Sequence, residues 1–432
     1  MKISPARAAA FDILLRIEAD KAYSSVLLPI YEADLTAIDR GLCHELTLGT
    51  LRRQIYLDRI IDHLTASKKI DVHVRIALRL GLYQLNFLDK IPQYSAINES
   101  VNLIQRARKT SAKGFVNAIL RRASRERIEL AFEDDIDRIS VETSHPRWLI
   151  EKWIADNGIE AALALANANN EIPGTAFRMT GERSEEGQIL IESATRSRYV
   201  EGCYVLGNHD QRVVELVERG EIYLQDEASQ IVAQAVPIPE NGRFLDVCAA
   251  PGGKTGLIAG RYSDKAALLA AGDLHWPRVE YLRGNCIRQG AGSVRIFQYD
   301  AERALPFAAQ SFDAVLVDAP CSGTGTIRHN PELRYSMAPD DLAALASKQL
   351  SILNNASNLV RADGTLIYST CSVEREENEW VCDKFLEQNR NFSSSTPNVD
   401  ERFVTAEGFA RTWPQRDSMD GFFIAAFRRT EP

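Results

Sequence analysis

The feature that most constrains the fold is an alternation of short β-rich runs and helical stretches that begins near residue 242. The β-rich runs are RFLDVC, ALLAAGD, VRIFQYD, FDAVLVDAP and GTLIYST. Strands that alternate with helices predict parallel βαβ units and a doubly wound sheet. In such a sheet, ligands bind outside the carboxyl ends of the strands. The residues that follow each run are therefore the first candidates for a functional site.

The chain before this alternation follows two other patterns. From residue 5 to about 125 the apolar residues recur at helical spacing, and Pro92 marks a break. This spacing predicts an all-helical bundle. The next segment contains short apolar runs such as GCYVL and EIYLQD and predicts a small mixed domain. We therefore predict a multidomain α + α/β chain with a helical domain over 1–135, a connecting α+β domain over 136–235 and an α/β domain over 236–432.

Charge is unevenly distributed between these parts. Residues 1–130 hold 21 Lys and Arg against 14 Asp and Glu, whereas the rest of the chain holds 30 against 45. Within the first part, Glu126 is the only acid in a basic stretch made of Arg106, Arg108, Lys109, Lys113, Arg121, Arg122, Arg125 and Arg127. Such a stretch could follow the phosphates of a nucleic acid, or it could be an ordinary solvated helix face.

Composition excludes several classes of protein. No run is long and apolar enough to span a membrane, and Asp12 and Glu18 interrupt the N-terminal apolar segment in a way that a signal peptide would not. We expect a cytoplasmic, monomeric protein. The cysteines are odd in number and form no CxxC pair, and the histidines are dispersed, so we predict reduced thiols and no metal. These cysteines are Cys43, Cys203, Cys248, Cys286, Cys321, Cys371 and Cys382.

A glycine-containing turn follows the first β-rich run. The sequence DVCAAPGGKT spans Asp246 to Thr255, and its adjacent glycines allow a backbone to approach a ligand closely. The turn is similar to a P-loop, but that motif requires a glycine six residues before its lysine, where this chain has Cys248. A nucleotide triphosphatase is therefore disfavoured, although AVLVDAP could imitate the strand that carries a magnesium-binding acid in such enzymes.

Acids and thiols follow the later runs. Asp273, Asp300 and Asp318 stand at the ends of three runs, where a carboxylate can accept hydrogen bonds from the ribose hydroxyls of a cofactor. Cys321 and Cys371 follow two runs that a doubly wound sheet places side by side. Both thiols could therefore face one pocket and support covalent chemistry. The alternative is that each cysteine is a small buried hydrophobic residue.

Taken together, DVCAAPGGKT, LVDAPCSGTG and YSTCS resemble the signature of the RNA cytosine-C5 methyltransferases, the NOL1/NOP2/Sun family. The resemblance extends over almost the whole chain. LTLGTLRR, LRLGLYQL and GFVNAILRR look like a NusB-type RNA-binding domain, which distinguishes a bacterial subfamily that acts on small-subunit rRNA. The resemblance implies a NusB-like helical bundle joined to a Rossmann-like class I methyltransferase sheet.

The same resemblance implies roles for individual residues. Cys371 is the nucleophile that adds to carbon 6 of cytosine, and Cys321 assists its release. Asp318 faces the cytosine edge and, with Asp273 and Asp300, completes the S-adenosylmethionine site. The cofactor loop consists of Cys248, Ala249, Ala250, Pro251, Gly252, Gly253 and Lys254. The implied substrate is 16S rRNA, and by subfamily the implied target is cytosine 967 in RNA numbering.

One departure from the family pattern concerns Asp273. The sequence GDLHWPR stands where relatives show a second acid in a D-I-D pattern, which puts the ribose contact of Asp273 in question. Two other classes of function stay open at this point. One is the nucleotide triphosphatase, and the other is a non-catalytic NusB-like RNA-binding factor, which would leave both cysteine motifs without a purpose.

Overall fold

The computed structural model describes residues 3–207 and 210–430, and it divides the chain into two compact units. Unit 1 covers the chain up to Glu171 together with Ile327–Met337. Unit 2 covers Ile172–Thr326 and the chain from Ala338 onward. These boundaries differ from the predicted ones at 135 and 235, so the three-part organisation remains a proposal.

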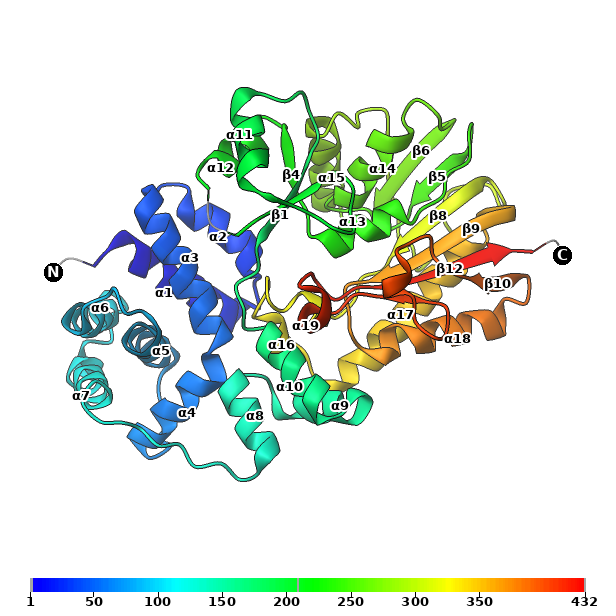
Figure 1. Cartoon of the computed structure of the whole chain (residues 1–432). Coiled ribbons are helices and arrows are strands. Elements are labelled where there is room, and N and C mark those ends of the chain that lie inside the picture. The colour runs from blue at the N-terminus through cyan, green and yellow to red at the C-terminus, as the bar shows by residue number, and fades with distance from the viewer. Residues whose placement is uncertain (1–2, 208–209, 431–432) are drawn as a thin grey trace. The chain divides into compact units, whose positions relative to one another are not determined.

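The helices of unit 1 before residue 125 form the predicted bundle. Their apolar positions make one continuous core, and the side chains of Ser4, Thr36 and Asp71 cap three of the helices by accepting backbone N–H groups. Pro92, the predicted break, immediately precedes a helix. These helices, blue to cyan in Figure 1, are α1 (Pro5–Asp20), α2 (Ser24–Glu32), α3 (Ala37–Arg52), α4 (Gln54–Thr65), α5 (Val72–Phe87), α6 (Gln93–Arg106) and α7 (Lys113–Ala123).

Unit 1 includes residues that the sequence places at the start of the connecting domain. The segment that begins with SHPRWLIEKW is helical and forms α8 (Asp135–Thr143), α9 (Arg147–Asn157) and α10 (Ile159–Ala168). Leu149, Ile150 and Trp153 on α9 are buried. The apolar pattern of this segment does not indicate with which domain it packs. In the structure it belongs to unit 1.

A segment from the second half of the chain completes unit 1. Ile327–Met337 contains the short helix α16 (Leu333–Ser336), and its buried Arg334 donates hydrogen bonds to the carbonyl oxygens of Thr143, Ser144 and Asn169, each at 3.2 Å. Burial lowers the pKa of Arg334 to about 10. The guanidinium thus adds hydrogen bonds to carbonyl groups near the ends of α8 and α10, two of which also accept from Asn170 and Tyr335.

Replacing Arg334 with Ala is expected to destabilise unit 1 by at least about 3 kcal/mol, because hydrogen bonds from a charged group contribute about 1.5–3 kcal/mol each. The exposed Ser336 on the same short helix, whose hydroxyl donates only locally to the Leu333 carbonyl, provides the control. Urea unfolding followed by circular dichroism measures the difference. An Arg334→Ala protein with the same midpoint as Ser336→Ala would contradict the anchoring role.

Unit 2 begins with a small antiparallel sheet of strand order β2-β3-β1-β4. Phe177, Leu190 and Leu216 lie in its core and join the sheet to two helices. The apolar runs GCYVL and EIYLQD contain the strands β3 and β4. The elements are β1 (Thr175–Met179), α11 (Glu185–Ser193), β2 (Thr195–Arg196), β3 (Cys203–Leu206), α12 (Arg212–Glu218) and β4 (Ile222–Leu224).

The larger sheet of unit 2 has the strand order β10-β12-β9-β8-β5-β6-β7, and β11 pairs with β12. The strands from β9 to β7 run parallel, whereas β12 is antiparallel to β9 and β10 is antiparallel to β12. All of the predicted β-rich runs are strands, and β8 and β9 are neighbours. The strands are β5 (Arg243–Asp246), β6 (Leu268–Asp273), β7 (Arg295–Gln298), β8 (Phe312–Asp318), β9 (Val360–Thr370), β10 (Phe392–Ser395), β11 (Ala410–Arg411) and β12 (Phe423–Arg429).

Helices cover both faces of this sheet, as Figure 1 shows. One apolar cluster joins the sheet to α13, α14 and α15, and another joins it to α17 and α18. Among the described residues, no helix is both long and apolar enough to cross a membrane. The helices of unit 2 that follow the small sheet are α13 (Glu227–Gln234), α14 (Gly253–Tyr262), α15 (Trp276–Arg288), α17 (Pro339–Ser357), α18 (Glu379–Gln388) and α19 (Pro414–Asp417).

Candidate active site

The predicted cofactor loop lies between the end of β5 and the start of α14. Gly252 precedes α14 with φ +101°, a conformation that side chains other than hydrogen rarely adopt. A Cβ atom at Gly252 would lie 2.8 Å from Cδ1 of Leu282. Glycine is therefore required here by the backbone and by α15, independently of any ligand.

Hydrogen bonds from three other elements hold this loop in place. Its Ala250 N–H donates to Oδ2 of Asp273 at 3.2 Å, and the Pro251 carbonyl accepts from Asn285 Nδ2 on α15 at 2.7 Å. The Gly253 carbonyl accepts from the buried guanidinium of Arg178, on β1, at 3.0 Å. Because its backbone is fixed from several sides, the loop is organised before any ligand binds.

Asp273 contacts the cofactor loop, despite the sequence departure that follows it. Arg278, the last residue of GDLHWPR, has its Nε 3.2 Å from Asp273 Oδ1 and also donates to the Ala250 carbonyl at 2.8 Å. The Asp273 carboxylate thus bridges the end of β6, the loop and α15. Its contact with a cofactor ribose remains a prediction.

Acidic side chains lie close to the cofactor loop. Asp246, at the end of β5, accepts a hydrogen bond from Thr255 at 2.7 Å, and its Oδ1 has no hydrogen-bond partner in the described part of the chain. Burial raises the pKa of Asp246 to about 7. Burial also raises the pKa of the Cys248 thiol, and the nearby Asp246, Asp273 and Asp318 raise it further. A region lined by these carboxylates favours a bound cation.

Lys254 links the loop to the end of β8. Its Nζ lies 2.8 Å from Oδ2 of Asp318 and 4.9 Å from the centre of the Phe422 ring. The other Asp318 oxygen accepts from Ser369 on β9 at 2.7 Å. Burial acts to lower the pKa of Lys254, but Asp318 outweighs it and the pKa is raised. Lys254 therefore stays charged, and Asp318 is its counter-ion.

The two predicted thiols meet at the ends of adjacent strands. Cys321 follows β8, Cys371 follows β9, and their Sγ atoms are 3.3 Å apart. The hydrogen bond with Cys371, and then burial, hold the pKa of Cys321 well above its usual range. The charge of Lys254 also interacts with Cys371. The ends of β8 and β9 thus bring together two thiols, of which Cys321 is held protonated, within reach of the charge of Lys254.

Asp300 lies in the turn after β7. Its carboxylate accepts from the Glu302 backbone at 3.0 Å and forms an ion pair with Arg303 at 3.2 Å. Within the described ranges, neither of these contacts ties Asp300 to the cofactor loop. Its role at the cofactor is still a prediction.

Three buried polar residues of this site are not among the residues that the sequence predicts. Glu377 binds the segments that follow both cysteines, Arg178 holds the loop, and Asp246 lies beneath it. Glu377 belongs to the acidic stretch EREENE, which has the composition of a solvated surface. Its position five residues after the TCS motif is the only signal that could have identified it.

Replacing Gly252 with Val is expected to weaken S-adenosylmethionine binding at least tenfold, because the strained backbone and the contact with Leu282 must displace the loop. Gly260→Val, in the α14 helix that Gly252 precedes, is the matched control, since a Cβ there meets no atom within 4 Å. Calorimetric titration measures affinity, and a melting curve verifies folding. Equal affinities of the two variants would contradict the assignment of the loop.

Two solved structures are similar in fold to this chain. The crystal structure of PH0851 matches with a TM-score of 0.84 at 24% identity and covers 99% of this chain and 100% of that one. The structure of NSun6 from Pyrococcus horikoshii with SFG matches with a TM-score of 0.59 at 20% identity, covering 66% and 99%. At these identities the likeness establishes the fold alone.

Sequence relatives establish the family. Residues 233–428 match the family described as 16S rRNA methyltransferase RsmB/F, and residues 4–125 match the NusB family. A probable ribosomal RNA small subunit methyltransferase B from Bacillus subtilis is 34% identical, covering 99% of this chain and 100% of the relative. The Pseudomonas syringae pv. tomato ribosomal RNA small subunit methyltransferase B is 33% identical, covering 88% and 86%. The chain therefore belongs to the 16S rRNA methyltransferase RsmB/F family and carries a NusB-family domain at its N-terminal end.

Proposed function

We propose that this methyltransferase modifies carbon 5 of a cytosine in 16S rRNA, through a covalent bond between Cys371 and carbon 6. By subfamily resemblance the target is cytosine 967 in RNA numbering. The observation that carries the proposal is the pair of thiols 3.3 Å apart beside the Lys254–Asp318 ion pair. S-adenosylmethionine is the cofactor of the family and supplies the methyl group.

The residues of the cofactor loop fit S-adenosylmethionine. The buried Oδ1 of Asp246 has no hydrogen-bond partner among the described residues, and Gly252 forms a turn with no side chain to obstruct a ligand. The carboxylates around Cys248 suit the positive charge of a sulfonium group. Residues 248–254 would hold the cofactor from one side, Asp273 would contact its ribose, and Asp300 and Asp318 would complete the site.

The thiols divide the covalent chemistry between them. Carbon 5 of cytosine is a poor nucleophile, but addition of the Cys371 thiolate to carbon 6 turns the ring into an enamine. After methylation the carbon 5 proton must leave and the thiolate must be expelled, so a second group near the adduct is required. Cys321, whose Sγ lies 3.3 Å from that of Cys371, is the proposed group for this release step and would have to act as the thiolate to accept the carbon 5 proton. Asp318 would accept hydrogen bonds from the amine of the cytosine and from its ring nitrogen once that nitrogen is protonated in the adduct.

The two alternative classes of function are less well supported. A nucleotide triphosphatase lacks its first P-loop glycine because that position is Cys248. Asp318, its proposed magnesium ligand, is the counter-ion of Lys254. A non-catalytic NusB-like factor would explain unit 1 but not the paired thiols.

Incubation with labelled S-adenosylmethionine, followed by nucleoside analysis, tests the proposal. Deproteinised 16S rRNA and assembled small subunits serve as separate substrates, which also distinguishes naked RNA from an assembling particle. We expect the label in 5-methylcytidine. Label in another nucleoside, or RNA binding without transfer, would contradict the proposed reaction, and magnesium-dependent nucleotide hydrolysis would favour the triphosphatase.

Unit 1 is the proposed RNA anchor, although part of its basic stretch is paired. The fold brings Asp12 to Arg106 at 2.6 Å and Asp71 to Lys109 at 2.8 Å, and Glu126 pairs with Arg122 at 2.7 Å. The prediction from sequence had counted only Glu126 among the nearby acids. The remaining cations of the stretch still include Arg121, next to Arg122 in the last turn of α7.

Reversing Arg121 and Arg122 to Glu in the full chain should lower RNA affinity and its salt dependence. Each phosphate of a single strand that the protein no longer neutralises reduces the slope of log affinity against log salt by about 0.7, and a phosphate of a duplex reduces it somewhat more. If each arginine neutralises one phosphate, the slope should fall by about 1.4. Filter binding over a range of salt concentrations measures this slope. The affinity for S-adenosylmethionine should remain unchanged.

The matched control reverses Arg183 and Arg198, two exposed arginines of unit 2, and changes the net charge equally. If both double variants alter the slope to the same extent, the basic stretch is not the anchor and unit 1 is better explained as a protein-docking module. A monomeric state, a cytoplasmic location and the absence of a bound metal remain predictions.

A further inference from the structure

A buried carboxylate lies between the segments that carry the two thiols. Glu377 follows β9 in a short helical turn, Arg375–Glu377, and its side chain is completely buried. Its Oε1 accepts from the Ser322 backbone N–H at 2.8 Å and from Gln349 Nε2 at 2.9 Å. Its Oε2 accepts from the hydroxyls of Ser322 and Ser372, the latter at 2.5 Å. Both oxygens are thus fully used within the protein.

The two serines are the immediate neighbours of the two cysteines. Ser322 follows Cys321, and Ser372 follows Cys371. One carboxylate therefore connects the segment after β8 to the segment after β9. The connection comes from the same oxygen atom, since Ser322 and Ser372 both donate to Oε2.

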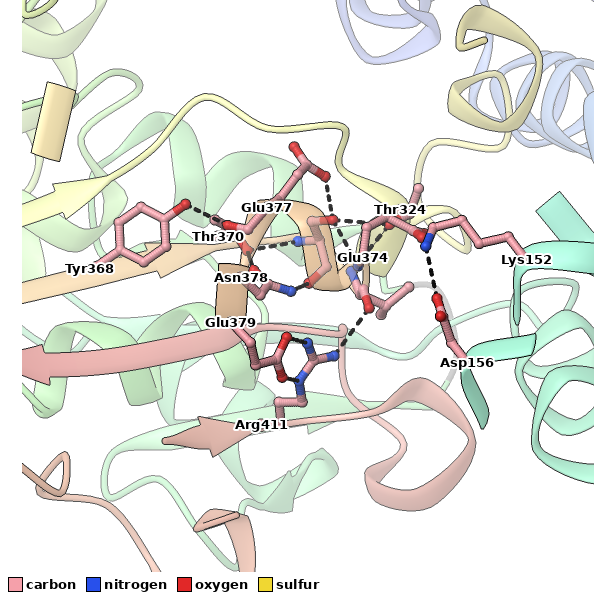
Figure 2. A network of polar contacts seen from close by, with 12 residues as sticks. Lys152, Asp156, Thr324, Tyr368, Thr370, Glu374, Glu377, Asn378, Glu379 and Arg411 are labelled. Carbon is pink, nitrogen blue, oxygen red and sulfur yellow. Dashed lines mark hydrogen bonds and ion pairs between the residues drawn. The ribbon is translucent and has the colours of Figure 1, made fainter. Parts of the chain in front are cut away.

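The residues around Glu377 fix its own position. Its carbonyl accepts from the Tyr368 hydroxyl on β9 at 2.5 Å, and the adjacent Asn378 accepts from the Thr370 hydroxyl at 2.5 Å. Asn378 also donates to the Ser372 carbonyl at 2.9 Å. Figure 2 shows Glu377 and Asn378 next to Thr370, with the Tyr368 ring on one side. Glu377 is therefore held through its backbone carbonyl as well as through its carboxylate.

We propose that Glu377 is a positioning residue that sets the separation and orientation of Cys321 and Cys371. This inference deepens the proposed function, because only a reaction that uses both thiols in turn requires their separation to be fixed. A buried carboxylate is costly unless its hydrogen bonds are satisfied, and here its donors come from the two segments that it joins and from Gln349 on α17. Glu377 itself touches neither Sγ atom in this arrangement.

Oxidative crosslinking provides a readout that does not depend on activity. A disulfide has a sulfur–sulfur length of about 2.05 Å, so the thiols at 3.3 Å need to approach by only about 1.2 Å. Diamide oxidises two thiols to a disulfide and is itself reduced to the hydrazine. In the full-length protein, mass spectrometry of non-reduced peptides gives the rate at which the Cys321–Cys371 bond forms.

Glu377→Gln should slow this crosslinking at least tenfold and lower kcat for methyl transfer by about 10²-fold, the effect expected of a misplacement near 1 Å. Affinity for S-adenosylmethionine should remain unchanged, since Glu377 does not contact the cofactor loop in the described residues. Asp383→Asn, an exposed carboxylate on α18, is the matched control and should behave like the wild type.

Ser372→Ala provides a second test if Glu377→Gln fails to fold. It removes the hydroxyl link on the Cys371 side while keeping the carboxylate buried, and it should also slow crosslinking. Wild-type crosslinking rates in the folded variant would overturn the positioning role. If Glu377→Gln slows crosslinking but the wild type produces no 5-methylcytidine, the proposed reaction is wrong while the positioning role of Glu377 stands.

Discussion

Cys371→Ala is expected to abolish methyl transfer, whereas Cys321→Ala is expected to accumulate a covalent complex between protein and RNA. Without the Cys371 thiol no bond to carbon 6 can form, so carbon 5 never becomes nucleophilic. Without the Cys321 thiol the bond still forms but its release is impaired. The family resemblance implies this division of roles, and the 3.3 Å between the two Sγ atoms places both thiols at the same adduct.

Denaturing gel electrophoresis with labelled 16S rRNA detects the complex as a band that survives denaturation. Cys43→Ala, in the core of unit 1, is the control for loss of a buried thiol and should leave transfer unaffected. Observation of the trapped complex with Cys371→Ala, and not with Cys321→Ala, would reverse the two roles.

Asp318→Asn should lower the rate of methyl transfer by about 10³-fold, within the range of about 10²–10⁴ that a group handling protons in a transition state contributes. The substitution removes the proposed acceptor for the cytosine edge. It also removes the counter-ion of Lys254, whose Nζ lies 2.8 Å from Asp318. The Lys254 ammonium group, whose charge interacts with Cys371, should change its position as a consequence.

Single-turnover kinetics with saturating S-adenosylmethionine separates this chemical effect from cofactor binding. Ser369→Ala is the matched control, because it removes only a hydrogen bond to the other oxygen of Asp318 and leaves the ion pair with Lys254 intact. A rate for Asp318→Asn as high as that of Ser369→Ala would show that the carboxylate has no direct role.

The sequence was sufficient to predict the main elements of the catalytic domain. Short β-rich apolar runs are local signals in the sequence. Each of the predicted runs forms one of the strands β5, β6, β7, β8 and β9. The adjacency of β8 and β9 follows from the topology of doubly wound sheets, so the proximity of Cys321 and Cys371 could also be predicted.

Long-range contacts could not be predicted in the same way. Nothing local indicates that Ile327–Met337, which follows the first cysteine motif, folds with unit 1 through the buried Arg334. Counting the charges near the basic stretch also does not predict that Asp12 and Asp71, which are distant in sequence, form ion pairs with it. Glu377 was missed for the same reason, since its acidic neighbours are typical of an exposed helix turn and only the fold buries it.

RNA containing 5-fluorocytidine tests the central claim most directly. Fluorine at carbon 5 cannot leave as a proton, so methyl transfer to that carbon leaves the thiolate attached to carbon 6. With wild-type protein and S-adenosylmethionine, we predict a stable complex whose peptide mass spectrum carries a methylated fluorocytidine on Cys371. A complex attached through Cys321, or no complex under conditions in which unmodified 16S rRNA is methylated, would contradict the proposed mechanism.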